Sequence, residues 1–357
     1  MKRLVAQLLC SRALALLCAL AAGAAPAEPA EATKTVESAD PTDKSEDSES
    51  PVQVDSGLLD RGHDSVERNL VNWIDGLDRF FADENYSATT NESFVRIAPG
   101  ILIRDGGQIR FKPRFRLNLQ LPRTERRIGL VLSSRNADED DLLDGGSADD
   151  DGFGAGLRAA IFDNRKTKLR LTAGSRFRPE PDPFVRLRLI RLRPVGGILL
   201  RPSITGSWEL EDGLGERMRL DVDMPTGPRS LVRLRGDASY GESTEGHEFR
   251  ASITHFFALR ERTAWRLEGR IDSHTRPVTE VTQYRALLRY RWSMLRPWLF
   301  FEIEPGIRFV REDGFDPAPE AIFRVEIVFG SRKNMGIFEA GTKRSPAYDD
   351  SADSDDD

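Results

Sequence analysis

Apolar and polar residues alternate with a period of two along much of this chain, and this pattern limits the fold more than any other feature. The clearest stretch is residues 108–121, where the two parities are Ile109, Phe111, Phe115, Leu117 and Leu119 against Arg110, Lys112, Arg114, Arg116, Asn118 and Gln120. Successive side chains of a strand point to opposite faces. The pattern therefore predicts a strand with one apolar and one polar face.

The same alternation continues to residue 330 and is interrupted by turn signals. It predicts fourteen strands, or twelve if weaker segments merge, at 93–104, 107–121, 126–134, 153–162, 166–177, 184–193, 197–209, 215–224, 229–240, 247–258, 263–272, 281–292, 297–310 and 320–330. Short connections such as 163–165 and 194–196 mostly alternate with longer acidic or Gly-rich ones such as 135–152.

The start of the chain is typical of a secretory signal peptide, which we place at residues 1–27. Lys2 and Arg3 precede an apolar run that ends in small residues. A short membrane anchor is the alternative. The only cysteines, Cys10 and Cys18, lie in this segment. The mature chain is therefore expected to contain no disulfide, thiolate metal site or cysteine nucleophile.

Composition divides the rest of the chain. Residues 28–63 and 331–357 are acidic and poor in large apolar residues, so a disordered linker and an acidic tail are expected there. Much of the net charge of −6 lies in these segments. Outside the first 25 residues no apolar run reaches 18, which excludes an inner-membrane helical protein.

An amphipathic helix is predicted over 65–82, within a helix-and-connector segment at 64–90. Its apolar residues recur at helical spacing: Val66, Leu70, Trp73, Leu77 and Phe80/Phe81. Polar residues, including Asp75 and Asp78, lie between them. The apolar stripe could pack on its own domain, plug or cap a larger structure, or bind a periplasmic partner.

Three features favour a membrane barrel over a soluble sandwich. They are the secretion signal, the alternation of short and long connections, and aromatic residues near the strand ends. The predicted aromatic belt comprises Trp208, Phe256, Phe257, Trp265, Trp292 and Trp298. The predicted fold is all-β, a transmembrane antiparallel up-and-down β-barrel of 12–14 strands over 91–330, preceded by one amphipathic helix.

Over residues 93–330 the sequence resembles Gram-negative outer-membrane β-barrels as a class. The predicted closing strand, 320–329, has apolar residues at alternate positions and ends in an aromatic residue, similar to the terminal signal of that class. The resemblance implies a cell outer membrane location, periplasmic termini and insertion by the barrel-assembly machinery. It also implies contact with outer-membrane lipid and lipopolysaccharide.

No residue pattern indicates an enzyme, a cofactor or a metal site. The four histidines, His63, His247, His255 and His274, stand in no recognisable catalytic arrangement. The acidic stretch 138–151 matches no calcium-loop spacing, and a solvated surface loop is the preferred interpretation. The arginines alternate with apolar residues behind a secretion signal, so no nucleic-acid partner is expected.

The polar face is the predicted functional feature, because a barrel turns it toward the lumen. The expected lumen-lining residues are Arg110, Lys112, Arg114, Arg116, Arg170, Arg233, Arg235, Arg266, Glu268, Arg270, Arg285, Arg289, Glu302, Glu304, Arg324 and Glu326. The excess of arginine predicts a passive channel for small solutes that favours anions. The alternatives are a polar face that only holds the wall together, and a non-conducting envelope scaffold whose helix and tails bind a partner.

Overall fold

The computed structural model of the chain describes residues 71–81, 93–121, 128–134, 153–164, 166–177, 180–243, 246–330 and 337. These residues all fall within the unit Asp55–Asp357. The predicted signal peptide, the acidic linker, the acidic stretch 138–151 and the tail apart from Ile337 lie outside them. Among the described residues, no helix is both long and apolar enough to cross a membrane.

Fourteen strands form the wall, and three of them are interrupted. Pro99 separates β1 from β2, Lys112 and Pro113 separate β3 from β4, and Leu192 separates β8 from β9. The segments are β1 Phe94–Ala98, β2 Gly100–Arg104, β3 Ile109–Phe111, β4 Arg114–Gln120, β5 Ile128–Ser134, β6 Phe153–Asp163, β7 Thr167–Phe177, β8 Pro181–Arg191, β9 Arg193–Val195, β10 Ile198–Glu209, β11 Gly213–Gly227, β12 Ser230–Gly241, β13 His247–Arg260, β14 Thr263–His274, β15 Glu280–Trp292, β16 Leu299–Val310 and β17 Pro317–Gly330.

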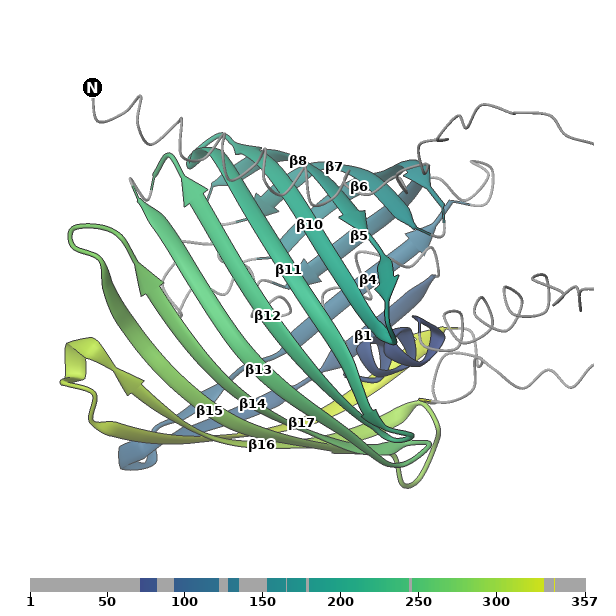
Figure 1. Cartoon of the computed structure of the whole chain (residues 1–357), viewed down its shortest axis with the longest axis vertical. Helices are drawn as coiled ribbons and strands as arrows, with labels where there is room; N and C mark the ends of the chain where they lie inside the picture. Colours follow the sequence, from purple (N-terminus) through teal and green to yellow (C-terminus); the bar gives the residue numbers. More distant parts are fainter. Residues whose placement is uncertain are drawn as a thin grey trace, which may run out of the picture. The chain divides into compact units, whose positions relative to one another are not determined.

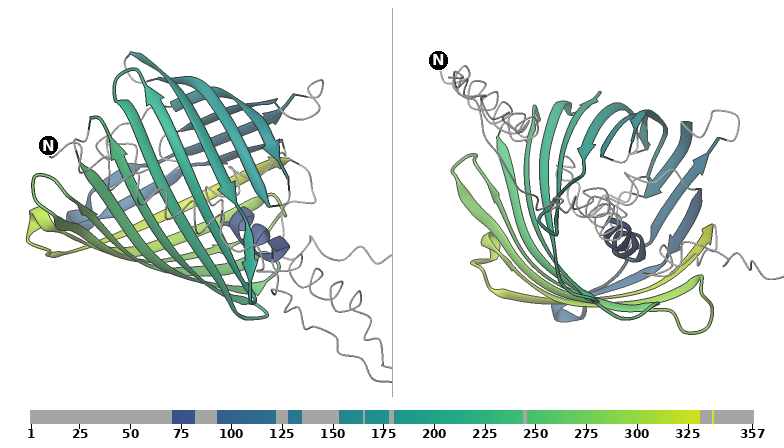
Figure 2. Two further views of the ribbon diagram at one scale, coloured as in Figure 1. Left: turned by 45° about the horizontal axis from the view of Figure 1, so that its top comes forward. Right: turned by 45° about the vertical axis from the view of Figure 1, so that its right-hand side comes forward.

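The sheet closes on itself. Each strand pairs antiparallel with its neighbours in the sequence, and β17 pairs with both halves of the first strand, β1 and β2. Figure 1 shows the tilted strands, and Figure 2 shows the wall curving around a central space. The predicted up-and-down barrel is confirmed, with the higher of the two expected strand numbers.

Burial alternates along the strands, with charged residues inside and apolar residues outside. On β12, Arg233, Arg235 and Asp237 are buried, whereas Leu234 and Tyr240 are exposed. The outward face carries many exposed large apolar side chains from β1 to β17. An apolar exterior around a polar interior is typical of outer-membrane barrels and the reverse of a soluble sandwich.

The two ends of the barrel differ in their connections. One end, here the short-turn end, carries the connections 196–197, 228–229, 261–262 and 293–298. Gly196 and Gly197 have φ angles of 57° and 84°, a left-handed conformation that favours glycine in a two-residue hairpin. The opposite end, here the loop end, carries 210–212, 242–246, 275–279 and 311–316. Among these connections the length contrast is weaker than predicted, and the longest predicted connection, 135–152, lies outside the described residues.

A charge on the outward face should destabilise the barrel. Leu234 lies near the middle of β12 with 41% of its surface exposed. Leu234→Arg is expected to lower the free energy of unfolding from lipid by about 2–4 kcal/mol, because the guanidinium would face hydrocarbon. Urea unfolding in liposomes measures this loss, with Leu234→Ala as the control for lost packing. Equal stability of the two variants would contradict a lipid-facing Leu234.

Candidate functional site

The structure places all sixteen predicted lumen residues on the inward, buried or half-buried face of the wall. They do not form one site. Six lie together on β15–β17, and five lie on β12–β14, where they take part in ion pairs. The remaining five, Arg110, Lys112, Arg114, Arg116 and Arg170, lie on the opposite wall, β3–β8.

On β10–β14, arginines and carboxylates alternate from strand to strand. Asp221 stands opposite Arg201 on one side and Arg235 on the other, and Arg235 donates to it at 2.6 Å. Asp237 accepts from Arg217 and Arg219 at 3.1 and 2.5 Å. Arg250 pairs with Asp272 across β13 and β14, and Arg270–Asp272 and Arg266–Glu268 are pairs within β14. Charge on this part of the wall is largely balanced by ion pairs across and along the strands.

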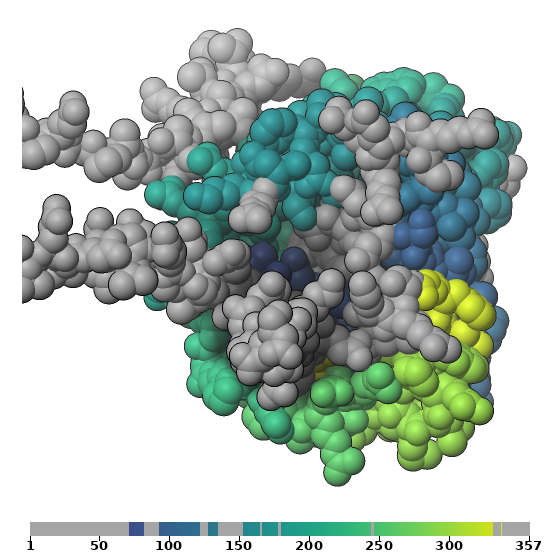
Figure 3. Space-filling model, turned by 90° about the vertical axis from the view of Figure 1, so that its right-hand side faces the viewer, coloured from purple at the N-terminus to yellow at the C-terminus, as the bar shows by residue number. Residues whose placement is uncertain are grey.

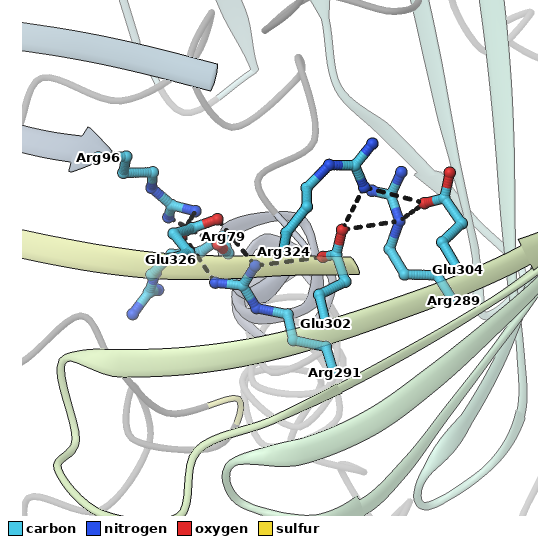
Figure 4. A network of polar contacts seen from close by, with 8 residues as sticks. All are labelled: Arg79, Arg96, Arg289, Arg291, Glu302, Glu304, Arg324 and Glu326. Atoms are coloured by element: carbon cyan, nitrogen blue, oxygen red, sulfur yellow. Dashed lines mark hydrogen bonds and ion pairs between the residues drawn. The ribbon is translucent and has the colours of Figure 1, made fainter. Parts of the chain in front are cut away.

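A second network lies on β15–β17 and β1, and Figure 4 shows it from close by. Arg291 binds Glu326 through two nitrogens at 2.8 and 2.9 Å, and Arg324 donates to Glu302 at 2.6 Å. Arg289 donates to Glu304. All of these side chains are at least nine-tenths buried. Because each charge has an opposite partner, the network can remain ionised out of bulk water.

The wall from β3 to β8 has a different balance. Its described lumen-facing positions carry ten basic residues and two acidic ones: Arg110, Lys112, Arg114, Arg116, Arg158, Lys168, Arg170, Arg176, Arg186 and Arg188 against Asp163 and Asp182. We call this surface the basic wall. Across its strands, Arg170 stands opposite Arg188 and Arg116 opposite Ser133. Like charges directly opposite each other destabilise a sheet, so the basic wall is not optimised for stability alone.

Residues 71–80 form a helix, as predicted, and it lies inside the short-turn end. Figure 2 shows it enclosed by the wall, and in Figure 3 its purple atoms lie between the teal strands and the green and yellow strands. Its apolar face packs on lumen-facing residues that we call the collar: Leu192, Leu199, Leu231, Phe256, Ala258, Ala264, Phe300 and Val328. The described part of the predicted helix therefore packs on its own domain and occupies the lumen.

Aromatic contacts join the helix to the collar. The ring centroids of Phe81 and Phe256 lie 5.5 Å apart, and those of Phe80 and Phe300 lie 5.7 Å apart. The guanidinium groups of Arg233 and Arg291 lie over the collar rings of Phe256 and Phe300, respectively. The collar on which the helix packs is thus in direct contact with the charged residues of the lumen.

Phe256 corrects the predicted aromatic belt. It is 1% exposed and faces inward, because it shares the parity of Thr254 and Ala258 rather than that of Ile253. Four of the other five belt residues lie on the outward parity of their strands, with Phe257 and Trp265 stacked at 5.7 Å. The fifth, Trp298, is exposed in the turn before β16. Proximity to a strand end did not distinguish an interfacial aromatic residue from a collar residue.

Asp78 is the main residue that the sequence analysis did not select. Its carboxylate accepts hydrogen bonds from Arg201 at 2.5 Å and from Arg233 at 2.6 Å. Asp223 contacts the same two arginines at 2.8 and 2.6 Å. The four side chains form a closed ring of alternating charge, here the Asp78 ring, in which no member is more than 4% exposed. Asp78 lies in line with Ile74 and Phe81 at helical spacing, so a charge within an apolar stripe was the available signal.

Further contacts hold the helix in place. The carbonyl oxygen of Arg79 accepts a hydrogen bond from Arg96 at 2.8 Å. A cation is favourable at this position, because the C-terminal end of a helix carries partial negative charge. Ile337 is 1% exposed, and its N–H donates to the carbonyl of Glu261 in a short turn. A Cβ on Gly76 would lie 2.3 Å from the carbonyl oxygen of Ile337, so only glycine permits this approach. Burial raises the pKa of the Asp75 carboxyl, while nearby cations act against this shift.

Two further groupings bring together side chains of the kinds used in catalysis or metal binding. Ser230 Oγ and His255 Nε2 lie 2.7 Å apart on the outward face, but among the described residues no carboxylate orients the imidazole as in a catalytic triad. At the loop end, carboxylate oxygens of Asp182, Glu209 and Asp212 lie within 4.8 Å of one another. Glu209 is ion-paired with Arg176. We therefore assign neither grouping a catalytic or metal-binding role.

Comparison with known proteins gives matches only among solved structures. No protein-family model and no curated protein matches the chain. The OccK2 (OpdF) structure of Pseudomonas aeruginosa with glucuronate covers 67% of this chain and 96% of its own, with 8% identity and a TM-score of 0.42. The DcaP channel of Acinetobacter baumannii covers 67% and 96%, with 8% identity and a TM-score of 0.39.

A KdgM porin in complex with oligogalacturonate covers 66% of this chain and 99% of its own, with 9% identity and a TM-score of 0.35. These similarities are too low to place the chain in any of these channel families. A function for this chain must therefore be argued from its own residues.

The collar should control the dynamics of the helix. Phe256→Ala removes the ring that contacts Phe81, a type of change that lowers stability by about 3–5 kcal/mol in a well-packed core. Amide hydrogen exchange of residues 71–81, measured by mass spectrometry in detergent, is expected to accelerate. Phe257→Ala is the matched control, because its neighbouring ring faces outward. If both variants exchange like the unmodified chain, the helix does not depend on the collar.

Proposed function

We propose that the protein is a passive channel of the outer membrane through which small solutes cross, with a preference for anions. The observation that carries this proposal is the basic wall, where ten basic and two acidic residues face the lumen. Rings or surfaces of arginine and lysine in a pore lower the energy of an anion and raise that of a cation.

The distribution of charge supports a route along one side of the lumen. Carboxylates on β10–β17 and the Asp78 ring balance the arginines nearby, so this side attracts ions weakly. The basic wall on β3–β8 has only two acids, Asp163 and Asp182, at its described lumen-facing positions. Glu209 on the neighbouring β10 also contacts Arg176 and Arg186, so the basic wall keeps an excess of positive charge that is only partly paired. An anion is therefore drawn to one wall rather than held uniformly around the barrel.

The size of the barrel is compatible with passage. Eight-stranded barrels are filled by their own side chains, whereas barrels of 16–18 strands leave a water-filled channel. Fourteen strands lie between these limits. The helix narrows the short-turn end, so the expected passage is small and suits small solutes rather than macromolecules.

The helix does not favour the scaffold alternative. An external partner would need the apolar face of residues 71–81, and that face is buried against the collar. We therefore propose that this helix limits the opening of the channel.

Charge removal from the basic wall should reduce anion preference. Arg186 and Arg188 lie on the lumen face of β8, whereas Arg191 on the same strand is exposed on the outward face. In planar bilayers under a KCl gradient, the unmodified protein is expected to show a reversal potential whose sign indicates a preference for chloride over potassium. The Arg186→Gln, Arg188→Gln double variant should move it toward zero.

The matched control is Arg191→Gln, which removes charge from the same strand without changing the lumen and should leave the reversal potential in place. Recordings near 0.1 M salt are preferred, because the screening length is about 10 Å there and only about 3 Å at 1 M. Cation preference, or bilayers without any discrete conductance, would refute the proposed channel.

A further inference from the structure

The Asp78 ring combines charges from two separate parts of the chain. Arg201, Asp223 and Arg233 lie on neighbouring strands of the wall, whereas Asp78 is supplied by the helix. The wall alone therefore contributes two guanidinium groups and one carboxylate. With Asp78 in place, the ring contains two positive and two negative charges.

Loss of Asp78 would leave a net positive charge where water has little access. All four side chains are at least 96% buried, and an unbalanced buried charge is strongly unfavourable. The two arginines would then present donors to whichever anion replaces the carboxylate. The contacts of Asp78 define the chemistry of that anion, because its two oxygens bridge Nη1 of Arg201 and Nη2 of Arg233.

We propose that Arg201 and Arg233 form a carboxylate-binding site in the lumen, and that Asp78 occupies it as a tethered ligand. A solute carboxylate competes with Asp78 for the two guanidinium groups, and its binding releases the helix from the collar. This inference rests on the proposed function, because it gives the same anion route a gate that responds to the solute.

The tether sets the concentration at which competition occurs. A ligand attached by a short segment acts at an effective concentration on the order of millimolar. A free carboxylate must therefore reach at least a comparable concentration to compete. The concentration needed is higher still, because the collar also holds the helix through Phe80 and Phe81. Release is expected to be graded over the millimolar range and weaker with chloride, a single atom that lacks the two separate oxygens by which Asp78 contacts Arg201 and Arg233.

The first test needs no substitution and no conduction. Amide exchange of residues 71–81 is measured on the full-length chain in detergent while acetate replaces chloride at constant ionic strength. Acetate is expected to accelerate exchange of this segment and leave the strands unchanged. An exchange rate that is the same in both salts would overturn the inference, even if the protein forms an anion channel.

The second test uses Asp78→Asn and its matched control, Asp237→Asn. Both remove a buried carboxylate that contacts two arginines, but Asp237 and its partners all belong to the wall. Asp78→Asn should give fast exchange of residues 71–81 in either salt and a larger conductance than the unmodified chain. Asp237→Asn should keep the slow exchange in chloride and the response to acetate.

Each result has a distinct meaning. Equal behaviour of the Asp78→Asn variant and the unmodified chain, in a protein that still conducts anions, overturns the tethered-ligand inference alone. Silent bilayers with an acetate-dependent exchange rate overturn the proposed channel and retain the binding site. Slower gel migration after heating shows that each variant has formed its barrel, which excludes misfolding as the cause.

Discussion

Pairing between the first and last strands is the constraint on which the rest of the structure depends. A membrane offers no water to an open sheet edge, so β17 must bond to β1 and β2 for the wall to exist there. Once the sheet is closed, every strand has an inside and an outside. The period-two pattern then places alternate side chains on an apolar exterior and in a charged interior.

Local pattern was sufficient for the wall but insufficient for what fills it. The strands and their inward parity follow from alternation, because a shift by one residue would turn arginines toward lipid, whereas the choice between twelve and fourteen strands came from the structure. Phe256 and Asp78 required information that no local window contains. The inward position of Phe256 depends on which strand ends surround the helix. The role of Asp78 depends on two arginines more than a hundred residues away, Arg201 and Arg233.

The charge in the lumen is divided by sequence region. The part of the chain from β10 onward contains arginines together with the acids that neutralise them, as in the cluster of Arg291, Glu302 and Glu326. The part from β3 to β8 contains arginines and few acids. Closure brings these two regions face to face, so ion pairs stabilise one side of the interior, and the proposed anion preference rests on the other side.

The collar has a consequence for the order in which the protein matures. Its residues come from β10, β12–β14, β16 and β17 and from Leu192 between β8 and β9, and Ile337, which follows the last strand, contacts the helix at Gly76. The helix precedes all of these residues in the chain but has no complete seat until the final strand has been added. Complete docking of the helix therefore requires the closed barrel, because an open one lacks part of the surface on which the helix packs.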